Sequence, residues 1–456
     1  MAATITAEMK KRFIDEFKAD ADSASVNYYI GISRSEDWNT SDTATTPTNT
    51  EREQRNFRHG LQSVKKVANY SFVIPRVNWT SGTTYAAYSD SVVAHPTVPY
   101  YAMIEANQVY VCLRQGINAA GVAQPSTVAP SGTTNISFTT ADGYAWKFLY
   151  SIGTLDAAAY KSANFIPVKL QGATTGSSPA TDVEQLGIQN ATIAGRQIVG
   201  FSLDSGGAGY SSNPTVTIVG DGTGAAASAV QSGGSIVSLT IDDSASTLKM
   251  GTGYNYASVA LSGGGSPTTI ATGKIIFGPK AGFGADPTDD LRARAIMFNT
   301  KPVGEEDGEF IVGNSFRQIG LIRNPTDSDG ASFTGDDGNA LRRLQLATRP
   351  TAFTQRAVVT GATSGAKAFV DKADSDEIWY HQTESTGFTA FVEAENVADT
   401  SGGAGTTQAA VTDADADAFI EPLVDKYSGD LLYIENRAAV TRAVGQTEDI
   451  KVIIEI

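Results

Sequence analysis

The chain has 456 residues, of which 41% are hydrophobic and 18% are charged, and its formal net charge is −15. This length allows about two to four domains, and the acidic balance without a basic block disfavours nucleic-acid binding. The only cysteine is Cys112, which excludes a fold held by intrachain disulfides. No apolar run reaches the ~18 residues of a membrane span, so we expect a protein of the reducing cytoplasm without membrane insertion.

The first 160 residues predict an α+β domain. Met9, Phe13 and Phe17 recur every four residues and indicate a helix with one apolar stripe, with Thr6 as its N-cap. A second helix is predicted over 50–69. Strands are predicted over 26–33, 70–76, 108–114 and 145–152, the last of them after a turn at Asp142-Gly143.

The middle of the chain predicts a duplicated β module over 205–278, which follows a connecting segment over 161–204. Gly209-Tyr210 and Gly253-Tyr254 each lead into an alternating strand, and the pairs lie 44 residues apart. We interpret the region as one inserted module with glycine at its turns.

The remainder predicts a framework domain over 279–349, an inserted β-hairpin module over 350–418, and strands over 419–456 that return to the framework. The hairpin covers 356–371 and is followed by a Gly/Thr-rich loop over 399–408. We expect the segment 431–434 to be a strand that ends at Glu435-Asn436-Arg437, and 449–456 to be a buried terminal strand. The predicted fold is therefore mainly β with some α, multi-domain, with antiparallel sheets or β-sandwiches and small inserted β modules.

The chemistry-bearing residues form no recognisable catalytic, cofactor or metal motif, and we predict no such site. His59, His95 and His381 are far apart, and zinc or nucleophile spacings are absent. The acidic stretch 413–417 has Ala418 and Val424 where a calcium loop needs glycine and glutamate, and the stretch 327–330, with Asp336-Asp337, has Pro325 at its first ligand position. Both are interpreted as solvated loops, with calcium binding left open.

Five segments in order carry a family resemblance: 34–38, 73–79, 142–146, 316–325, and 428–437 together with 446–448. Together they resemble the gene product eight family, a baseplate wedge protein of T-even-like contractile-tailed bacteriophages. The signature residues, as framework or interface positions, are Arg34, Trp38, Pro75, Arg76, Trp79, Gly143, Trp146, Arg317, Gln318, Asn324, Pro325, Glu435, Asn436 and Arg437.

The resemblance implies a homodimeric structural subunit of the tail baseplate, assembled in the host cytoplasm, that links neighbouring wedge proteins and catalyses nothing. Baseplate proteins next to the tail fibres are further partners that it allows. Two alternatives stay open. One is a tail adhesin that binds host-surface glycans through the β insertions. The other is a polysaccharide hydrolase, for which the candidate carboxylates are Glu36-Asp37, Glu305-Glu306 and Glu435.

Overall fold

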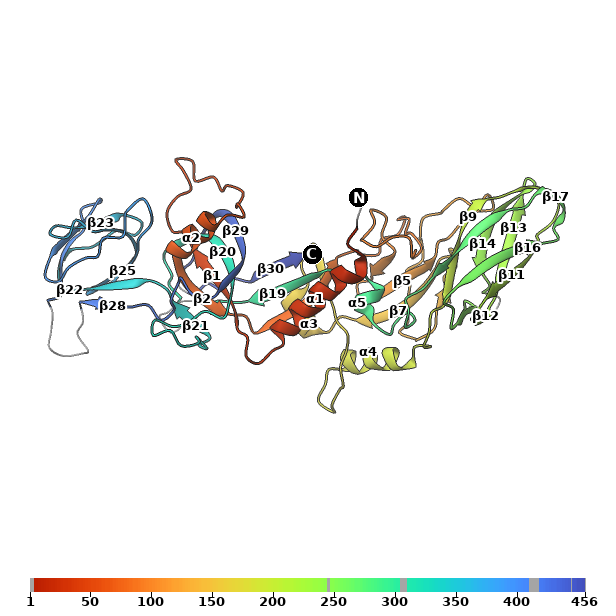
Figure 1. Cartoon of the computed structure of the whole chain (residues 1–456), viewed down its shortest axis with the longest axis horizontal. Coiled ribbons are helices and arrows are strands. Elements are labelled where there is room, and N and C mark those ends of the chain that lie inside the picture. The colour runs from red at the N-terminus through yellow and green to blue at the C-terminus, as the bar shows by residue number, and fades with distance from the viewer. Residues whose placement is uncertain (1–3, 244–246, 304–309, 410–417, 444, 456) are drawn as a thin grey trace. The chain divides into compact units, whose positions relative to one another are not determined.

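The computed structural model describes residues 4–243, 247–303, 310–409, 418–443 and 445–455. The chain is mainly β, with antiparallel sheets, which confirms the predicted class (Figure 1). It divides into two compact units, Met1–Ile14 with Ser71–Met297 and Ile454–Ile456, and Asp15–Tyr70 with Phe298–Ile453. In the described part of the chain, no helix is long and apolar enough to cross a membrane.

Between Ser71 and the β module, the first unit contains two helices and a four-stranded sheet in its described residues. Its elements before the β module are β3 Asn69–Pro75, β4 Tyr101–Met103, β5 Gln108–Arg114, β6 Phe138–Thr139, β7 Ala145–Ser151, α3 Thr154–Tyr160, β8 Phe165–Val168 and α4 Ala180–Ala191. The sheet order is β4-β5-β7-β6. Its core contains Tyr110, Cys112, Trp146 and Phe148, and Ile188 of α4 packs against it. The strands over 70–76, 108–114 and 145–152 are therefore confirmed.

In its described residues, 198–243 and 247–277, the β module of the first unit contains ten strands. They are β9 Ile198–Ser205, β10 Ala208–Tyr210, β11 Thr215–Gly220, β12 Thr223–Ala225, β13 Ala227–Ser232, β14 Ser235–Ile241, β15 Met250–Thr252, β16 Ala257–Ser262, β17 Gly265–Thr269 and β18 Thr272–Phe277. After it come α5 Pro287–Asp290 and β19 Ala295–Thr300.

The pairing in this module is nested around its centre. β13 pairs with β14, β12 with β15, β11 with β16, β10 with β17, and β9 with β18. Exchanging the half β9–β13 for the half β14–β18 maps every pairing onto another pairing or onto itself. The sequence repeats in the same way, with Gly-x-Gly-Tyr at 207–210 and 251–254 and Ile-Val at 198–199 and 236–237. The module is thus an intertwined duplication with approximate two-fold topology.

The second unit contains a five-stranded sheet with order β21-β2-β1-β20-β29. Its elements are β1 Tyr28–Ser33, α2 Glu51–His59, β2 Leu61–Lys66, β20 Ser315–Arg323, β21 Asp337–Asn339 and β29 Asp430–Thr441. Gly31 and Gly320 lie opposite each other on β1 and β20. Without side chains they leave room for the ring of Phe57, whose Cζ lies 2.4 Å from where a Cβ on Gly320 would stand. The two glycines therefore let α2 pack closely on the sheet.

The predicted helix over 50–69 is correct only for its first half. Thr50 caps α2 by accepting from the Glu53 N–H at 3.2 Å, but α2 ends at His59 and Gly60 follows it. Leu61 and Val64 are then buried in β2, which pairs with β1. The pairing of β2 in a sheet outweighs the helical propensity of its residues.

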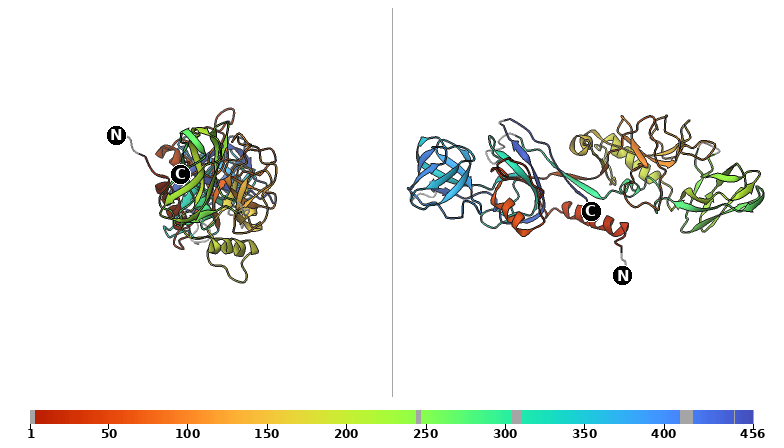
Figure 2. Two further views of the ribbon diagram at one scale, coloured as in Figure 1. Left: turned by 90° about the vertical axis from the view of Figure 1, so that its right-hand side faces the viewer. Right: turned by 90° about the horizontal axis from the view of Figure 1, so that it is seen from above.

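The second unit also contains a seven-stranded sheet that closes on itself. Its strands are β22 Arg342–Thr351, β23 Val358–Gly361, β24 Lys367–Ala373, β25 Glu377–His381, β26 Asn396–Asp399, β27 Ala404–Thr407 and β28 Phe419–Ile420. The order is β25-β24-β23-β26-β27-β22-β28, and β25 also pairs with β22. Six strands therefore form a closed barrel, drawn in light blue in the right-hand view of Figure 2. Leu344, Val359, Val370 and Ile378 fill its core.

Within the barrel, the predicted hairpin over 356–371 is confirmed as β23 and β24. The segment 399–408, predicted as a loop, instead contains the turn and second strand of the hairpin β26–β27. Val397 on β26 and Thr407 on β27 are buried. Both strands belong to the closed sheet, although the glycines and threonines of 399–408 predict a loop.

The helix α1 (Ala7–Ala21) and the strands β29 and β30 (Ile450–Glu455) differ in part from the predictions for 9–17, 431–437 and 449–456. In α1, Thr6 accepts from the Met9 N–H, and Ile14 is buried, but Met9 and Phe13 remain 45% and 42% exposed. β29 does not end at Glu435 to Arg437, because β20 continues to pair with it as far as Thr441. β30 is an edge strand beside β19, in a different sheet from β29, and is only partly buried.

Candidate functional site

The loop that follows β1 is anchored by a buried guanidinium from β20. Arg317 is 1% exposed. Its Nε and Nη2 donate to the two carboxylate oxygens of Asp42, each at 2.7 Å, and Nη2 also donates to Asp37 Oδ1 at 2.6 Å. Its Nη1 donates to the Ser35 carbonyl at 2.5 Å. Such a bidentate arrangement fixes both position and orientation of the loop.

Trp38 connects the same loop to β29. Its Nε1 donates to the Arg437 carbonyl at 2.9 Å, and the Arg34 guanidinium lies over the indole, 4.4 Å from the ring centroid. Arg437 stands where the β20–β29 register shifts, between the partners of Phe316 and Gln318. A register shift leaves backbone groups outside the ladder, and here one of them binds Trp38. Among the described residues, the Arg437 side chain itself has no hydrogen bond or ion pair.

The next signature residues form an amide network beside this loop. Gln318 Nε2 donates to Asn436 Oδ1 at 2.8 Å and to Glu53 Oε1 at 3.3 Å. Glu435 pairs with Ile319 across the strands and accepts from the Tyr433 hydroxyl at 3.1 Å. Glu435 therefore has a structural partner on its own strand.

Asn324 and Pro325 form the corner at the other end of β20. Asn324 has φ +50°, which asparagine tolerates better than most residues. It exchanges two hydrogen bonds of 2.8 Å with the backbone of Asn27. The Pro325 carbonyl accepts from the Phe333 N–H.

The other five signature residues lie in the first unit and do not join the cluster at the Arg317 loop. Arg76 donates to the Ser162 carbonyl at 2.9 Å, and Trp79 Nε1 donates to Ser126 Oγ at 3.2 Å. Trp146 is fully buried. Pro75 accepts through its carbonyl from the Tyr101 hydroxyl, and Gly143 has φ +83° in its turn. These contacts are those of architectural residues.

A buried acid–histidine–acid cluster, which no sequence pattern predicts, lies beside the Arg317 loop. His381 on β25 is 1% exposed, and its Nδ1 lies 2.6 Å from Asp371 Oδ2 on β24. Its Nε2 faces Glu36 Oε2 at 3.4 Å, and Asn314 Nδ2 donates to the other oxygen of Asp371 at 3.1 Å. The three charged residues are of common types and are separated by up to 345 positions, so only the fold identifies them as a set.

The electrostatics of this cluster favour a charged imidazole. Burial alone would lower the pKa of His381, but Asp371 and Glu36 together raise it to about 9. Burial would likewise raise the pKa of Glu36, but His381 and Arg34 lower it to about 2. The cluster therefore joins the loop after β1 to the barrel by ion pairs at neutral pH.

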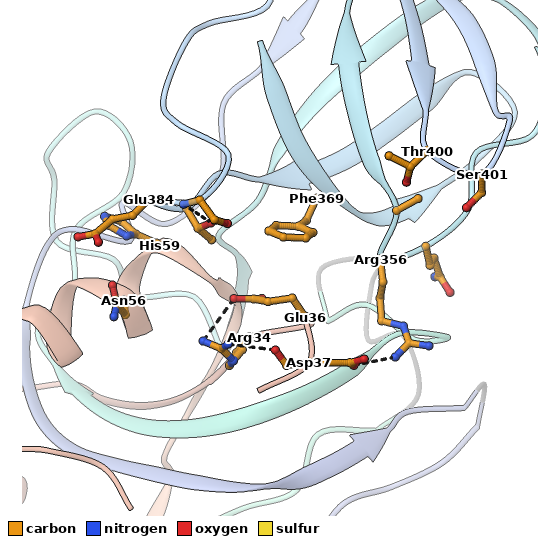
Figure 3. Close-up of a pocket in the computed structure, with 14 residues that line it drawn as sticks. Arg34, Glu36, Asp37, Asn56, His59, Arg356, Phe369, Glu384, Thr400 and Ser401 are labelled. Carbon is orange, nitrogen blue, oxygen red and sulfur yellow. Dashed lines mark hydrogen bonds and ion pairs between the residues drawn. The ribbon is translucent and has the colours of Figure 1, made fainter. Parts of the chain in front are cut away.

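A polar cleft of about 720 Å³ opens beside this cluster. Figure 3 shows Phe369 between two groups of lining residues. Arg34, Glu36 and Asp37 come from the loop after β1, and Arg356, Thr400 and Ser401 come from the barrel. Asn56, His59 and Glu384 close a third side. Arg356 Nη1 donates to Asp37 Oδ1 at 3.3 Å across the cleft wall.

The acidic segments considered as candidate calcium ligands and as candidate catalytic carboxylates do not come together in one site within the described residues. Asp327 Oδ1 accepts from the N–H groups of Asp329 and Ala331, which makes 327–330 a self-bonded turn. The segments 413–417 and Glu305-Glu306 lie outside the described residues. Within the described ranges, no group of three or more His, Cys, Asp and Glu side chains could hold a metal ion.

No protein-family model matches the chain, and no curated protein matches it. The family resemblance therefore depends on the signature segments alone.

Proposed function

We propose that this chain is a structural subunit of the baseplate wedge of a contractile-tailed phage, similar to the gene product eight family. It acts as a homodimer that links neighbouring wedge proteins during tail assembly in the host cytoplasm, and it catalyses no reaction. In this proposal the chain is a multi-domain protein whose framework carries the regions over 205–278 and 350–418 as inserted β modules.

One observation carries the proposal: signature residues from three distant segments meet at one loop. Arg34 and Trp38 contact each other, Arg317 holds the loop, and Gln318 and Arg437 complete the network. The segments are about 280 and 400 positions apart in the chain. Segments chosen only because they resemble one family would not be expected to share contacts unless they belonged to one framework, so the convergence supports the resemblance.

The contacts also support a structural rather than a chemical role for these residues. The guanidinium of Arg317 is occupied by two carboxylates and a carbonyl, and Glu435 is occupied by Tyr433. Groups that are held in this way define a rigid corner, which a subunit needs when it must keep several neighbours in fixed positions.

The test uses the full chain and the particle. Light scattering after size-exclusion chromatography should give twice the chain mass of 47.8 kDa. Mass spectrometry of purified tails from the source phage should find the chain in a fixed ratio to other baseplate proteins. A monomer in solution together with absence from tails would overturn the proposal.

A further inference from the structure

The polar cleft is of a size and shape that suits a small ligand. Its volume of about 720 Å³ lies within the range of roughly 300–1,000 Å³ of small-molecule sites. Its walls come from the loop after β1, from α2 and from several barrel loops, all within the second unit. The fold therefore brings separate segments to one concave surface.

The lining excludes several ligand classes. Among the lining residues only Ala357 and Phe369 have wholly apolar side chains, so a lipid or a hydrophobic molecule would meet mostly polar groups. Two guanidinium groups, of Arg34 and Arg356, are balanced by carboxylates of Glu36, Asp37 and Glu384. A phosphate or a nucleotide needs an excess of positive charge, and the cleft has none.

Hydrogen-bonding groups of both kinds remain for a ligand. Within the described part of the chain, the side chains of Asn56, Gln355 and Ser401 line the cleft without a hydrogen-bond partner. An amide offers both donors and an acceptor, and a hydroxyl offers one donor and two lone pairs. A ligand rich in hydroxyl groups, which both donate and accept, matches such a lining.

Phe369 supplies the aromatic surface that a sugar ring also needs. One side of its ring stacks on His381, with centroids 5.4 Å apart and an interplanar angle of 23°. His381 is itself fixed by Asp371 and Glu36, so the phenyl ring is held in place before any ligand arrives. A preformed aromatic platform binds the C–H face of a sugar ring at little entropic cost.

We propose that this cleft binds a short neutral oligosaccharide, which stacks on Phe369 and bonds to Asn56, Gln355 and Ser401. The proposal goes beyond the structural role, because binding needs neither a dimer nor a tail. It also places glycan binding at the edge of the barrel and not in the duplicated module over 198–277.

The experiment probes the full chain with an array of neutral and acidic bacterial oligosaccharides, followed by calorimetry with the best neutral binder. Gln355→Ala should weaken binding about fivefold with no change in melting temperature, and Phe369→Ala at least tenfold. Phe369→Trp should retain binding. The control is Tyr256→Ala, which removes an aromatic ring that is 68% exposed on the module and should leave affinity unchanged.

Several outcomes overturn the proposal. They are an array without any neutral binder, a preference for acidic glycans, or affinity that survives Gln355→Ala and Phe369→Ala. Loss of tail incorporation in Gln355→Ala without any glycan binding would identify the cleft as a protein contact instead. Binding by a chain that is absent from tails would uphold this proposal while the baseplate proposal fails.

Discussion

Replacing Arg317 by alanine removes the anchor of the loop after β1. The guanidinium is 1% exposed and bonds to Asp37, Asp42 and the Ser35 carbonyl. The substitution leaves these acceptors in place without their donor and leaves a gap where the side chain was.

The magnitude follows from the burial of each acceptor. Ser35 is fully buried, and an unpaired buried carbonyl costs about 1–3 kcal/mol. Asp37 and Asp42 are 56% and 32% exposed, so water replaces part of the lost interaction and each contributes at most about 1 kcal/mol. The cavity left by the aliphatic stem adds roughly 1 kcal/mol. Together these contributions predict that Arg317→Ala lowers the free energy of unfolding of the second unit by about 2–6 kcal/mol at pH 7.

The effect should depend on pH. The hydrogen bond from Arg317 is the main cause that lowers the pKa of Asp42. A carboxylate with a lowered folded pKa stabilises the fold above its unfolded pKa of ~3.9, and this stabilisation is lost as the pH falls through the folded value. The difference between wild type and Arg317→Ala should therefore narrow below pH ~4.

Urea unfolding, followed by hydrogen exchange of the peptide that contains 34–42, measures both the global and the local effect. The matched control is Arg342→Ala, which breaks the ion pair with Glu421 whose partners are 52% and 58% exposed and should cost under about 0.5 kcal/mol. A loss of less than about 1 kcal/mol in Arg317→Ala, or no change in exchange at 34–42, would show that the buried guanidinium is not the anchor.

Three further perturbations test other parts of the second unit. Because the pKa of His381 is raised to about 9, the stabilisation from its charged form is complete below pH ~6.5 and disappears as the pH rises through about 9. The free energy of unfolding of the wild type should fall over that interval, and that of His381→Gln should fall less. An equal dependence on pH in the two proteins would contradict the cluster. Gly320→Ala places a Cβ 2.4 Å from Phe57 Cζ and should cost about 1–3 kcal/mol, partly recovered by Phe57→Leu in the double variant; full stability of the single variant would refute the close packing. Glu395, 2% exposed, accepts from two backbone N–H groups at the tip of the β23–β24 hairpin and from the Ser364 hydroxyl, so Glu395→Ala should cost about 2 kcal/mol and speed hydrogen exchange at 361–365; unaltered exchange would exclude this role.

Local patterns in the sequence were enough to predict many single strands. The alternation over 108–114 predicts β5 with its correct bounds, and the hairpin over 356–371 folds as predicted. The errors arise where pairing with distant strands, and not the local sequence, determines the secondary structure. Residues 61–66 lie in a sheet because β1 and β21 flank them, and no window of sequence contains those partners.

The candidate site was predictable only in part. The resemblance selected Arg34, Trp38 and Arg317, but it did not indicate that Arg317 would meet Asp37 and Asp42. The cluster at His381 was missed because Glu36 comes from the loop after β1 and Asp371 from the neighbouring strand β24, and only the fold brings both carboxylates to the imidazole. A site whose residues come from distant segments can be recognised only when the topology that brings them together is known.

The nested pairing of the duplicated module has a consequence for how it folds. The strands β13 and β14 are joined by Gly233-Gly234, both with positive φ, so their hairpin closes the shortest loop and is the natural nucleus. Each later pair encloses the one before it, and β9 with β18 closes last, with Ile198 opposite Phe277. The strand pairs should therefore form in order from the central hairpin outward. Each later pair joins residues that are farther apart in the sequence, and this separation limits the folding rate. The last pair to form, β9 with β18, also holds the two ends of the module together. The whole module can therefore be inserted into or deleted from the surrounding chain at a single point.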